Sequence, residues 1–455
     1  MKRLLLALVL LGLLCTAAPA VAETKTETFR FPVEVKGYQV KQEMTYGVEH
    51  PHVDGHIVGM STNIVNADGS PVPIQRLMLH HIVFSKLGEQ NPLCSQYTGF
   101  DANQKLPGLA TPLYGAGEER NVLAFPPGYG LKLGANDTWL MTWMLMNHRK
   151  VKDHAFIEWK VTYTTDPVQD THLYWLDVVN CHADPIFNVP GGGKPGSTYT
   201  RTAEITMPES GHVVAAGGHV HGGADGLAIS QPDCENRTII RSVPAWGMPD
   251  HPFYHVKPIL HEPGPIAMSG TLSAQGFPVA AGQRIRLTST YDNQYPHTRV
   301  MGIAGMYVAP SSGPVDGCGP LPSDAQTFQT PLPHRTTPPR FKVPLIGLDT
   351  NGKAVTIQRP PGKTVKLSSG SSIQVKSFFF SRPNVAVKRG AKLSWLFKGA
   401  AGDLHNVTLA NGPRGFASPN YGTDATFSYR FKKPGKYQIF CALHPVSMTE
   451  TVTVK

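Results

Sequence analysis

The chain has 455 residues and a formal net charge of +10 at pH 7. Its 45 glycines and 40 prolines make up roughly a fifth of the sequence, against about an eighth in average proteins. The lysines and arginines are scattered without a basic run, so the charge gives no reason to expect nucleic acid as a partner. After residue 22 no stretch approaches the roughly 18 apolar residues of a spanning helix, so we expect no membrane span.

The amino terminus has the pattern of a secretory signal peptide. It begins Met1-Lys2-Arg3, continues with an apolar run from Leu4 to Leu14, and reaches Ala20-Val21-Ala22 before the polar Glu23. A basic start, an apolar centre and small residues at the end predict cleavage after Ala22. We therefore expect residues 1–22 to be removed and the mature protein to be exported, either periplasmic or extracellular.

Beyond the signal peptide, short alternating runs such as 57–65 and 155–163 predict an all-β chain, because no long helical periodicity is present. The mature length suggests roughly three domains. A break near residues 165–167 and a proline-rich stretch with little periodicity divide the chain. The predicted segments are a first strand-rich block at 23–165, a second at 166–309, a Pro-rich linker at 310–361 and a C-terminal domain at 362–455.

The first block carries a candidate metal-ligand group in His80 and His81, with His148 farther along the chain. Adjacent residues on a regular strand point to opposite faces of the sheet. His80 and His81 can therefore share one metal ion only if the strand bulges or the rings reach round a sheet edge.

The second block carries His219 and His221 two residues apart, which places both rings on one face of a strand. The flanking glycines allow close approach of a ligand or of backbone. Downstream, either Met301 or Met306 can supply a thioether. Two imidazoles and a thioether bind Cu(I) well and leave a position open for dioxygen.

Most other histidines have no persuasive ligand spacing, and we expect them to be surface or hydrogen-bonded side chains. These are His50, His52, His56, His154, His172, His182, His212, His251, His255, His261 and His334.

The order His-His, His, His-x-His, Met across two strand-rich blocks resembles the copper type II, ascorbate-dependent monooxygenases. The stretches from Gly55 to His81 and from Gly211 to Met301 are more closely similar to the stress-up-regulated nodulin family, and the resemblance covers about residues 28–309. It implies two tandem β-sandwiches, each holding one mononuclear copper ion.

Transferred by motif, the resemblance assigns His80, His81 and His148 to an electron-storing copper site. It assigns His219, His221 and Met301 to the catalytic, oxygen-binding site. Two positions depart from the peptide-hydroxylating enzymes, because Gly217 and Gly305 stand where those enzymes have an arginine and a tyrosine. Peptide amidation is therefore not supported.

Near the carboxyl terminus, Cys441, His444 and Met448 lie in one short loop, and His405 lies 36 residues before the cysteine. A thiolate, two imidazoles and a weak thioether are the ligands of a blue-copper electron-transfer site. Between them, residues 427–440 read as strand, Pro-Gly turn and strand. This region resembles the cupredoxins, close in Cys-to-His spacing to amicyanin and plastocyanin, while the spacing to Met448 departs slightly. The resemblance implies a Greek-key β-sandwich with a type 1 copper site.

With Cys441 assigned as a ligand and Cys15 in the signal peptide, four cysteines remain: Cys94, Cys181, Cys234 and Cys318. In an oxidising compartment they suggest two disulfides, with three possible pairings.

Together these patterns favour an exported multicopper oxidoreductase, an O₂-dependent monooxygenase-like protein acting on an unknown small molecule. The cupredoxin, on a flexible tether, would pass on single electrons from ascorbate or a redox protein. One alternative is a non-enzymatic copper-binding or electron-transfer protein in metal handling or stress response. Another is that only the C-terminal domain binds metal and the front half is a carbohydrate- or surface-binding scaffold.

Overall fold

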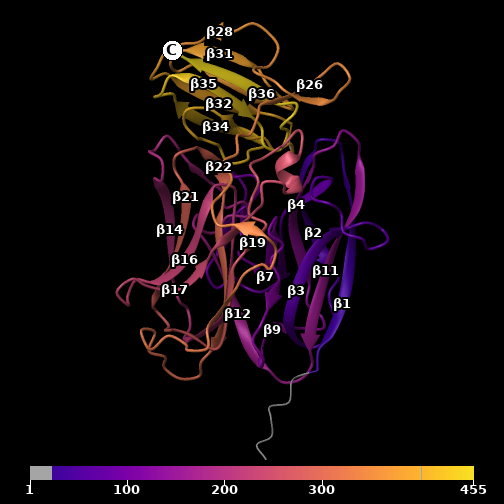
Figure 1. The fold of residues 1–455 in the computed structure, drawn as a ribbon, viewed down its shortest axis with the longest axis vertical. Coiled ribbons are helices and arrows are strands. Elements are labelled where there is room, and N and C mark those ends of the chain that lie inside the picture. Colours follow the sequence, from indigo (N-terminus) through magenta and orange to yellow (C-terminus); the bar gives the residue numbers. More distant parts are fainter. Residues whose placement is uncertain (1–22, 401) are drawn as a thin grey trace, which may run out of the picture.

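The computed structural model describes residues 23–400 and 402–455; the predicted signal peptide, 1–22, lies outside them. The described chain is all-β, as predicted, and its strands form three sandwiches. Two sandwiches stand side by side and the C-terminal one caps the same end of both (Figure 1). Among the described residues, none of the helical segments is long and apolar enough to cross a membrane.

The first sandwich forms because its strands alternate apolar and polar side chains. In β11 (Asp153–Thr164) the side chains of Ala155, Ile157 and Trp159 are buried in the core, and those that alternate with them lie on the other face of the sheet. Strand β4 (Leu77–Leu87) is buried along most of its length. The other strands are β1 (Lys25–Val35), β2 (Val40–Val48), β3 (Gly55–Val65), β5 (Gln96–Thr98), β6 (Lys105–Pro107), β7 (Ala110–Gly117), β8 (Leu123–Ala124), β9 (Tyr129–Leu133) and β10 (Trp139–Asn147).

The second sandwich packs the layer β14-β21-β16-β17 against strands of a larger sheet. A single 3-10 turn, η1 (Pro252–His255), interrupts the strands in this part of the described chain. The strands are β12 (Gln169–Asp177), β13 (Phe187–Val189), β14 (Thr198–Thr206), β15 (Gly211–Val220), β16 (Ala224–Gln231), β17 (Arg237–Ser242), β18 (Pro244–Gly247), β19 (Ala267–Met268), β20 (Gly270–Val279), β21 (Arg284–Asp292), β22 (His297–Val300) and β23 (Gly302–Pro310).

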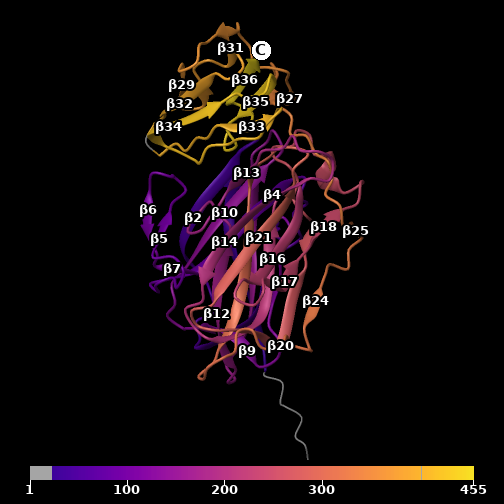
Figure 2. The same cartoon turned by 90° about the vertical axis from the view of Figure 1, so that its left-hand side faces the viewer.

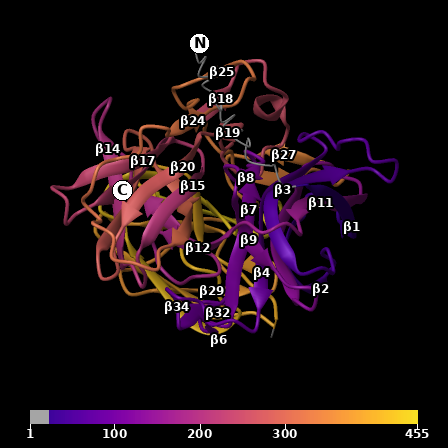
Figure 3. The same ribbon diagram turned by 90° about the horizontal axis from the view of Figure 1, so that it is seen from below.

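The two front sandwiches share one continuous sheet. Strand β12 pairs in parallel with β9 of the first sandwich and antiparallel with β23 of the second. The result is a ten-stranded sheet that runs through both units (Figure 3). The Cys94–Cys181 disulfide joins the same two units.

The predicted linker differs from a free tether, because several of its segments are attached to the body. Strand β24 (Gln326–Phe328) pairs with β20, and β25 (His334–Arg335) pairs with β18. The Cys234–Cys318 disulfide adds a covalent attachment. The hairpin of β26 (Ile346–Leu348) and β27 (Ala354–Thr356) is held by a hydrogen bond from the Ala354 amide to the Tyr38 hydroxyl, 3.1 Å.

The C-terminal domain is a sandwich of the layers β28-β31-β36-β35-β33 and β30-β29-β32-β34. Trp395 and Phe397 fill the space between the layers and are fully buried. Its strands are β28 (Val365–Lys366), β29 (Ser372–Lys376), β30 (Phe379–Phe380), β31 (Asn384–Val387), β32 (Lys392–Lys398), β33 (Thr408–Asn411), β34 (Thr423–Arg430), β35 (Gly435–Phe440) and β36 (Thr449–Val454).

The core of the C-terminal domain continues into the front half. Its hydrophobic cluster includes Met78 and Met144 of the first sandwich and Leu260 from the loop after η1. Polar contacts reinforce this docking, for example from the Ala102 amide to the Asn420 carbonyl, 2.9 Å. The domain therefore sits directly on both front sandwiches (Figure 2).

Candidate metal centres

The C-terminal candidate ligands are held by a short loop between two paired strands. Cys441 directly follows β35, and Met448 directly precedes β36. The Cys441 amide donates to the Met448 carbonyl, 3.0 Å, and the Met448 amide donates to the His444 carbonyl, 3.0 Å. His405 is fixed from the other side by two backbone hydrogen bonds with Tyr421, each 2.9 Å. Backbone pairing thus places all four residues without help from a ligand.

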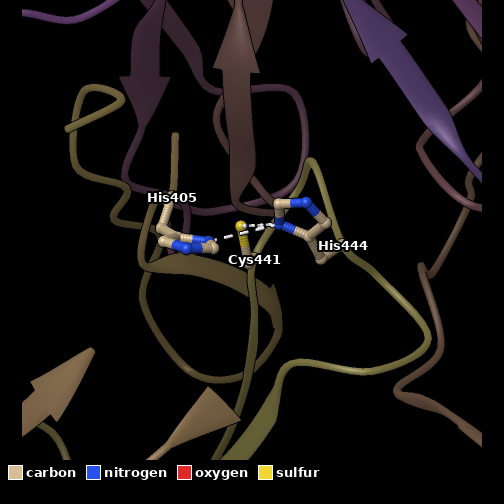
Figure 4. Close-up of side chains that lie close together, drawn as sticks. All are labelled: His405, Cys441 and His444. Atoms are coloured by element: carbon tan, nitrogen blue, oxygen red, sulfur yellow. Dashed lines mark hydrogen bonds between the residues drawn. The ribbon is translucent and has the colours of Figure 1, made fainter. Parts of the chain in front are cut away.

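The donor atoms of His405, Cys441 and His444 converge on one point (Figure 4). The Cys441 Sγ lies 3.5 Å from His444 Nδ1, and the two Nδ1 atoms of His405 and His444 lie 3.3 Å apart. Met448 is fully buried in the same hydrophobic cluster as Cys441. The predicted first three ligands are therefore brought together, and Met448 is packed beside them.

Burial sets the electrostatics of this centre. It raises the pKa of the Cys441 thiol, lowers the pKa of His405 and lowers the pKa of His444 to about 4. Cys441 is the free cysteine among the described residues. The buried His405 Nε2 has no hydrogen-bond partner. One free thiol and two neutral imidazoles, one from the loop and one from the segment paired with Tyr421, fit the donor set that copper prefers.

A phenylalanine from the turn between β29 and β30 covers the two imidazoles. The Phe378 ring lies 4.8 Å from the His444 ring and 5.8 Å from the His405 ring, edge to face in both cases. Phe378 itself is 48% exposed. It therefore separates the histidines from solvent on the side away from the buried loop.

In the front half, a bulge brings His80 and His81 together. Along the β10–β4 pair, Met144 is opposite His81 while the next residue, Leu145, is opposite Leu79. His80 is the extra residue, so the strict alternation of faces is broken there. The Nδ1 atoms of His80 and His81 lie 3.0 Å apart. The condition required by the sequence, a bulged strand, is met.

His219 and His221 also converge, at the end of β15. Their Nε2 atoms lie 3.1 Å apart. His219 Nδ1 is within 3.0 Å of Glu119 Oε1, and Glu119 is buried at the end of β7. When Nδ1 carries the proton, it donates a hydrogen bond to the carboxylate, and Nε2 of His219 is then free as a ligand.

The predicted pairs form one assembly. The His80 ring lies 4.8 Å from that of His221 and 4.9 Å from that of His261. We refer to His80, His81, His219, His221 and His261 as the histidine cluster. The resemblance implies one mononuclear copper site within each sandwich, but the two histidine pairs meet where the two sandwiches touch.

His148 is placed at the margin of this cluster. Its ring is 6.5 Å from that of His261 and 6.0 Å from that of Phe253. It is buried, and neither ring nitrogen has a hydrogen-bond partner. The resemblance groups His148 with His80 and His81, but the neighbouring histidine ring in the structure is that of His261.

The two candidate methionines differ in their surroundings. Met306 is fully buried in the hydrophobic core of the second sandwich. Met301 lies between β22 and β23, and its carbonyl accepts a hydrogen bond from the Tyr291 hydroxyl, 2.6 Å. The same hydroxyl accepts a hydrogen bond from the backbone amide of His221, 2.9 Å. Tyr291 therefore fixes Met301 relative to the His219–His221 pair.

Three residues of the site, His261, Glu118 and Glu119, were not predicted from the sequence. His261 has no ligand spacing in the sequence but belongs to the cluster. Glu118, which follows β7, lies beside it, with its Oε1 atom 3.3 Å from His261 Nε2. Two adjacent acidic residues, Glu118 and Glu119, closing an apolar strand were an available signal. His261 offered none, because its partners are far away in the sequence.

Burial lowers the pKa of four cluster histidines, His80, His81, His221 and His261, so these four side chains are neutral at ordinary pH. Burial lowers the pKa of His81 and of His261 to about 4, and that of His148 to about 3. The pKa values of His80 and His221 lie well below the usual range, from burial first and then from neighbouring histidines. Neutral imidazole is the form that binds metal ions.

Two cavities meet at the cluster. A cavity of about 770 Å³ is bordered by His81, His219 and Met301, and by apolar side chains that include Leu109, Trp175, Leu272 and Phe328. A second cavity, about 410 Å³, separates the histidine cluster from the C-terminal domain.

The second cavity lies directly between the two candidate centres. Its walls include His80, His81 and His221 on one side and Phe440, Ala442 and Leu443 on the other. The last three residues flank Cys441 in sequence. The C-terminal centre and the histidine cluster are thus neighbours in space.

A chain of hydrogen bonds also leads away from Cys441. The Asn406 amide donates to Cys441 Sγ, 3.4 Å, and its side chain donates to Asn420, 2.9 Å. Asn420 then donates to Asp184, 3.2 Å. Asp184 also accepts from Arg299, 2.5 Å, two residues before Met301.

Comparison with known proteins gives two partial matches. Residues 141–311 match the family model described as Stress up-regulated Nod 19. Amicyanin-alpha of Methylorubrum extorquens is 27% identical over 81 residues, which is 17% of this chain and 66% of the amicyanin. The chain therefore spans slightly less than two thirds of that relative.

Solved structures similar to the chain include a purple cupredoxin from Nitrosopumilus maritimus, at 24% identity and a TM-score of 0.17. The match covers 19% of this chain and 99% of that one. An oxidised amicyanin variant matches at 22% identity and a TM-score of 0.17, covering 20% of this chain and 86% of that one. A region similar to the Nod 19 family and a cupredoxin-like domain are thus joined in one chain.

Proposed function

We propose that the protein is a copper-dependent oxidoreductase in which the cupredoxin-like domain passes single electrons to the histidine cluster. The observation that carries this proposal is the shared cavity of about 410 Å³, bordered by Ala442 and Leu443 next to Cys441 and by His80 and His221. Direct juxtaposition of two candidate centres is what intramolecular electron transfer needs.

In this proposal His405, Cys441, His444 and Met448 hold a type 1 copper ion. Copper in such a ligand set supplies reversible one-electron redox chemistry. The protein contributes a rigid, buried loop, because backbone hydrogen bonds already close it. The Asn406 amide, 3.4 Å from Cys441 Sγ, stabilises the thiolate form.

His219 and His221, with Met301, are proposed as the catalytic set of the front half. Their proximity supports the pairing, since Tyr291 holds Met301 and His221 through one hydroxyl. In the family resemblance the first-block histidines, His80, His81 and His148, hold a second mononuclear copper ion. Its position beside the His219–His221 pair would allow it to supply an electron over a short distance.

The cavity of about 770 Å³ favours an enzyme over a copper carrier. It opens beside His81, His219 and Met301 and is lined mostly by apolar side chains. Sites for organic substrates have this size and character. We propose that it holds an apolar small molecule with its reacting carbon next to His219, in a reaction of the monooxygenase type.

The electron donor in this proposal is ascorbate or a redox protein. We further propose that the mature protein is exported, to the periplasm or the extracellular space. The disulfides Cys94–Cys181 and Cys234–Cys318 support this location, because such bonds persist in oxidising compartments.

The test uses the full chain loaded with copper and the variant Cys441→Ser. We expect an intense blue, purple or green colour in the oxidised wild type, its loss in the variant, and copper retained in the front half. With ascorbate as donor, the variant should consume oxygen much more slowly than the wild type. Ser447→Ala, an exposed position in the same loop, is the control and should behave as wild type.

Two results would contradict the proposal. A copper-loaded wild type without the thiolate colour would remove the type 1 assignment. If the wild type is coloured and binds copper in its front half but consumes no oxygen with any donor, the enzymatic function is wrong. The non-enzymatic copper-binding protein is then the remaining alternative.

A further inference from the structure

Three donor atoms from distant segments meet where the two front sandwiches touch. They belong to His80 at the bulge of β4, Glu118 after β7, and His261 in the loop between η1 and β19, and they lie within 4.8 Å of one another. The His261 Nε2 is 3.3 Å and the His80 Nε2 is 4.0 Å from Glu118 Oε1. The monooxygenase resemblance assigns neither His261 nor Glu118 to a metal.

Backbone groups orient two of the three donor side chains, His261 and Glu118, by hydrogen-bonding the polar atom that does not face the site. His261 Nδ1 lies 2.6 Å from the carbonyl oxygen of Glu262, which can only accept, so Nδ1 carries the proton and Nε2 keeps its lone pair. Glu118 Oε2 accepts the Gly264 amide at 2.7 Å. Backbone partners of this kind orient metal ligands and fix their tautomer.

The site also contains buried polar groups that have few partners. The Glu118 side chain is only 7% exposed, and in the described part of the chain its ion-pair contacts are with His80 and His261. The nearby His148 is buried with both ring nitrogens unpartnered. Burying a carboxylate among neutral imidazoles is costly unless a cation is present.

We propose that His80, Glu118 and His261 form a metal site that bridges the two sandwiches and takes a divalent transition-metal ion, with His148 as the nearest further donor. Two imidazoles and one carboxylate form a three-residue set with an open position. The Met78 sulfur, 3.3 Å from His261 Nε2, adds a soft neighbour that favours copper over zinc.

This inference rests on the proposed function and deepens it, because it names the ligand set of the centre that faces the cupredoxin-like domain. It replaces His81 by His261 and Glu118 as partners of His80. His81 is then free to join the His219–His221 pair, and it borders the larger cavity together with His219.

The test measures metal binding rather than turnover. The full chain carrying Cys441→Ser, which silences the C-terminal thiolate, is stripped with a chelator and titrated separately with Cu²⁺ and with Co²⁺, the latter read by its visible bands. Glu118→Gln and His261→Gln are compared in this background with His255→Gln, an exposed histidine of the same region. Metal-free thermal unfolding shows whether each variant is folded.

We expect the parent and His255→Gln to bind the same number of equivalents. Glu118→Gln and His261→Gln should each lose one equivalent, or bind it at least about tenfold more weakly. If both folded variants bind as many equivalents with unchanged affinity, the proposed ligand set is wrong. The proposed function is judged separately, with Cys441 intact, by the thiolate colour and by electron transfer to the front half.

Discussion

At the scale of single residues, the position of a thioether decides whether it can act as a ligand. Met301 lies beside both cavities, and its backbone is tied to that of His221 through the Tyr291 hydroxyl. Met306 is fully enclosed by the core of the second sandwich. Two methionines five residues apart therefore have different surroundings, and only Met301 borders the cavities.

We predict that Met301→Leu and Met306→Leu have different effects. Met301→Leu should weaken Cu(I) binding in the front half by at least about tenfold, equal to about 1.4 kcal/mol, because the thioether stabilises the reduced ion. Met306→Leu should leave Cu(I) affinity unchanged and cost less than about 1.5 kcal/mol of unfolding free energy. Competition with a Cu(I) chelator and chemical denaturation measure the two quantities. Equal Cu(I) affinities for both variants would contradict the assignment.

The convergence of the C-terminal candidate residues was predictable because most of them are close in sequence as well as in space. Cys441, His444 and Met448 share one loop, and His405 lies on a neighbouring strand edge. His261 could not be found in this way, since its partners come from segments more than a hundred residues away. Its contacts depend on how two sandwiches meet, which no local spacing encodes.

At the scale of elements, the ends of β7 and β15 face each other and control the shape of the cluster. Gly117 ends β7, and a Cβ built on it would lie 2.5 Å from His219 Cε1. Gly217 lies within β15, two residues before His219, and a Cβ there would meet nothing within 4 Å. Only the first glycine is needed for the position of the imidazole.

Gly117→Ala should therefore displace His219, whereas Gly217→Ala should not. We expect the first variant to lose metal affinity in the front half by at least about tenfold, with the C-terminal colour unchanged. The second variant should bind metal as the wild type does. Metal titration of both proteins, with circular dichroism to verify folding, is the measurement. Unchanged binding in Gly117→Ala would show that the His219 position is not required.

The strands themselves were largely predictable from alternation, but two features were not. The bulge at His80 is an irregularity of pairing between β4 and β10, and the sequence of either strand alone does not reveal it. Strands β24 and β25 are only three and two residues long, so they carry no periodic signal within a proline-rich segment. The bulge and the two short strands form only through pairing with a neighbouring strand, which the local sequence does not specify.

At the scale of the whole molecule, the connection between the second sandwich and the C-terminal domain is fastened to the body. Cys318 lies within it and is bonded to Cys234, which precedes β17. The C-terminal core then continues into the first sandwich through residues such as Met78. The C-terminal domain is therefore packed against the front half and does not move freely on a tether.

Replacing Cys234 and Cys318 together by alanine should destabilise the protein. The bond closes a loop with a sequence separation of 84, for which the chain-entropy relation gives about 4–5 kcal/mol. We expect a lower midpoint of denaturant unfolding, while the thiolate colour of the folded protein persists because Cys441 is untouched. The control is the wild type, measured with and without reductant. A variant as stable as the oxidised wild type would mean that β24 and β25 alone fasten the connection.

The sheet that runs through both front sandwiches limits how this protein can be divided. Separation near residues 165–167 would remove the parallel pairing between β9 and β12 and turn both into edge strands. Open edges present unpaired amides and carbonyls that recruit other chains. A fragment bearing either sandwich alone is thus expected to aggregate, and the smallest piece suited to separate study keeps both sandwiches together.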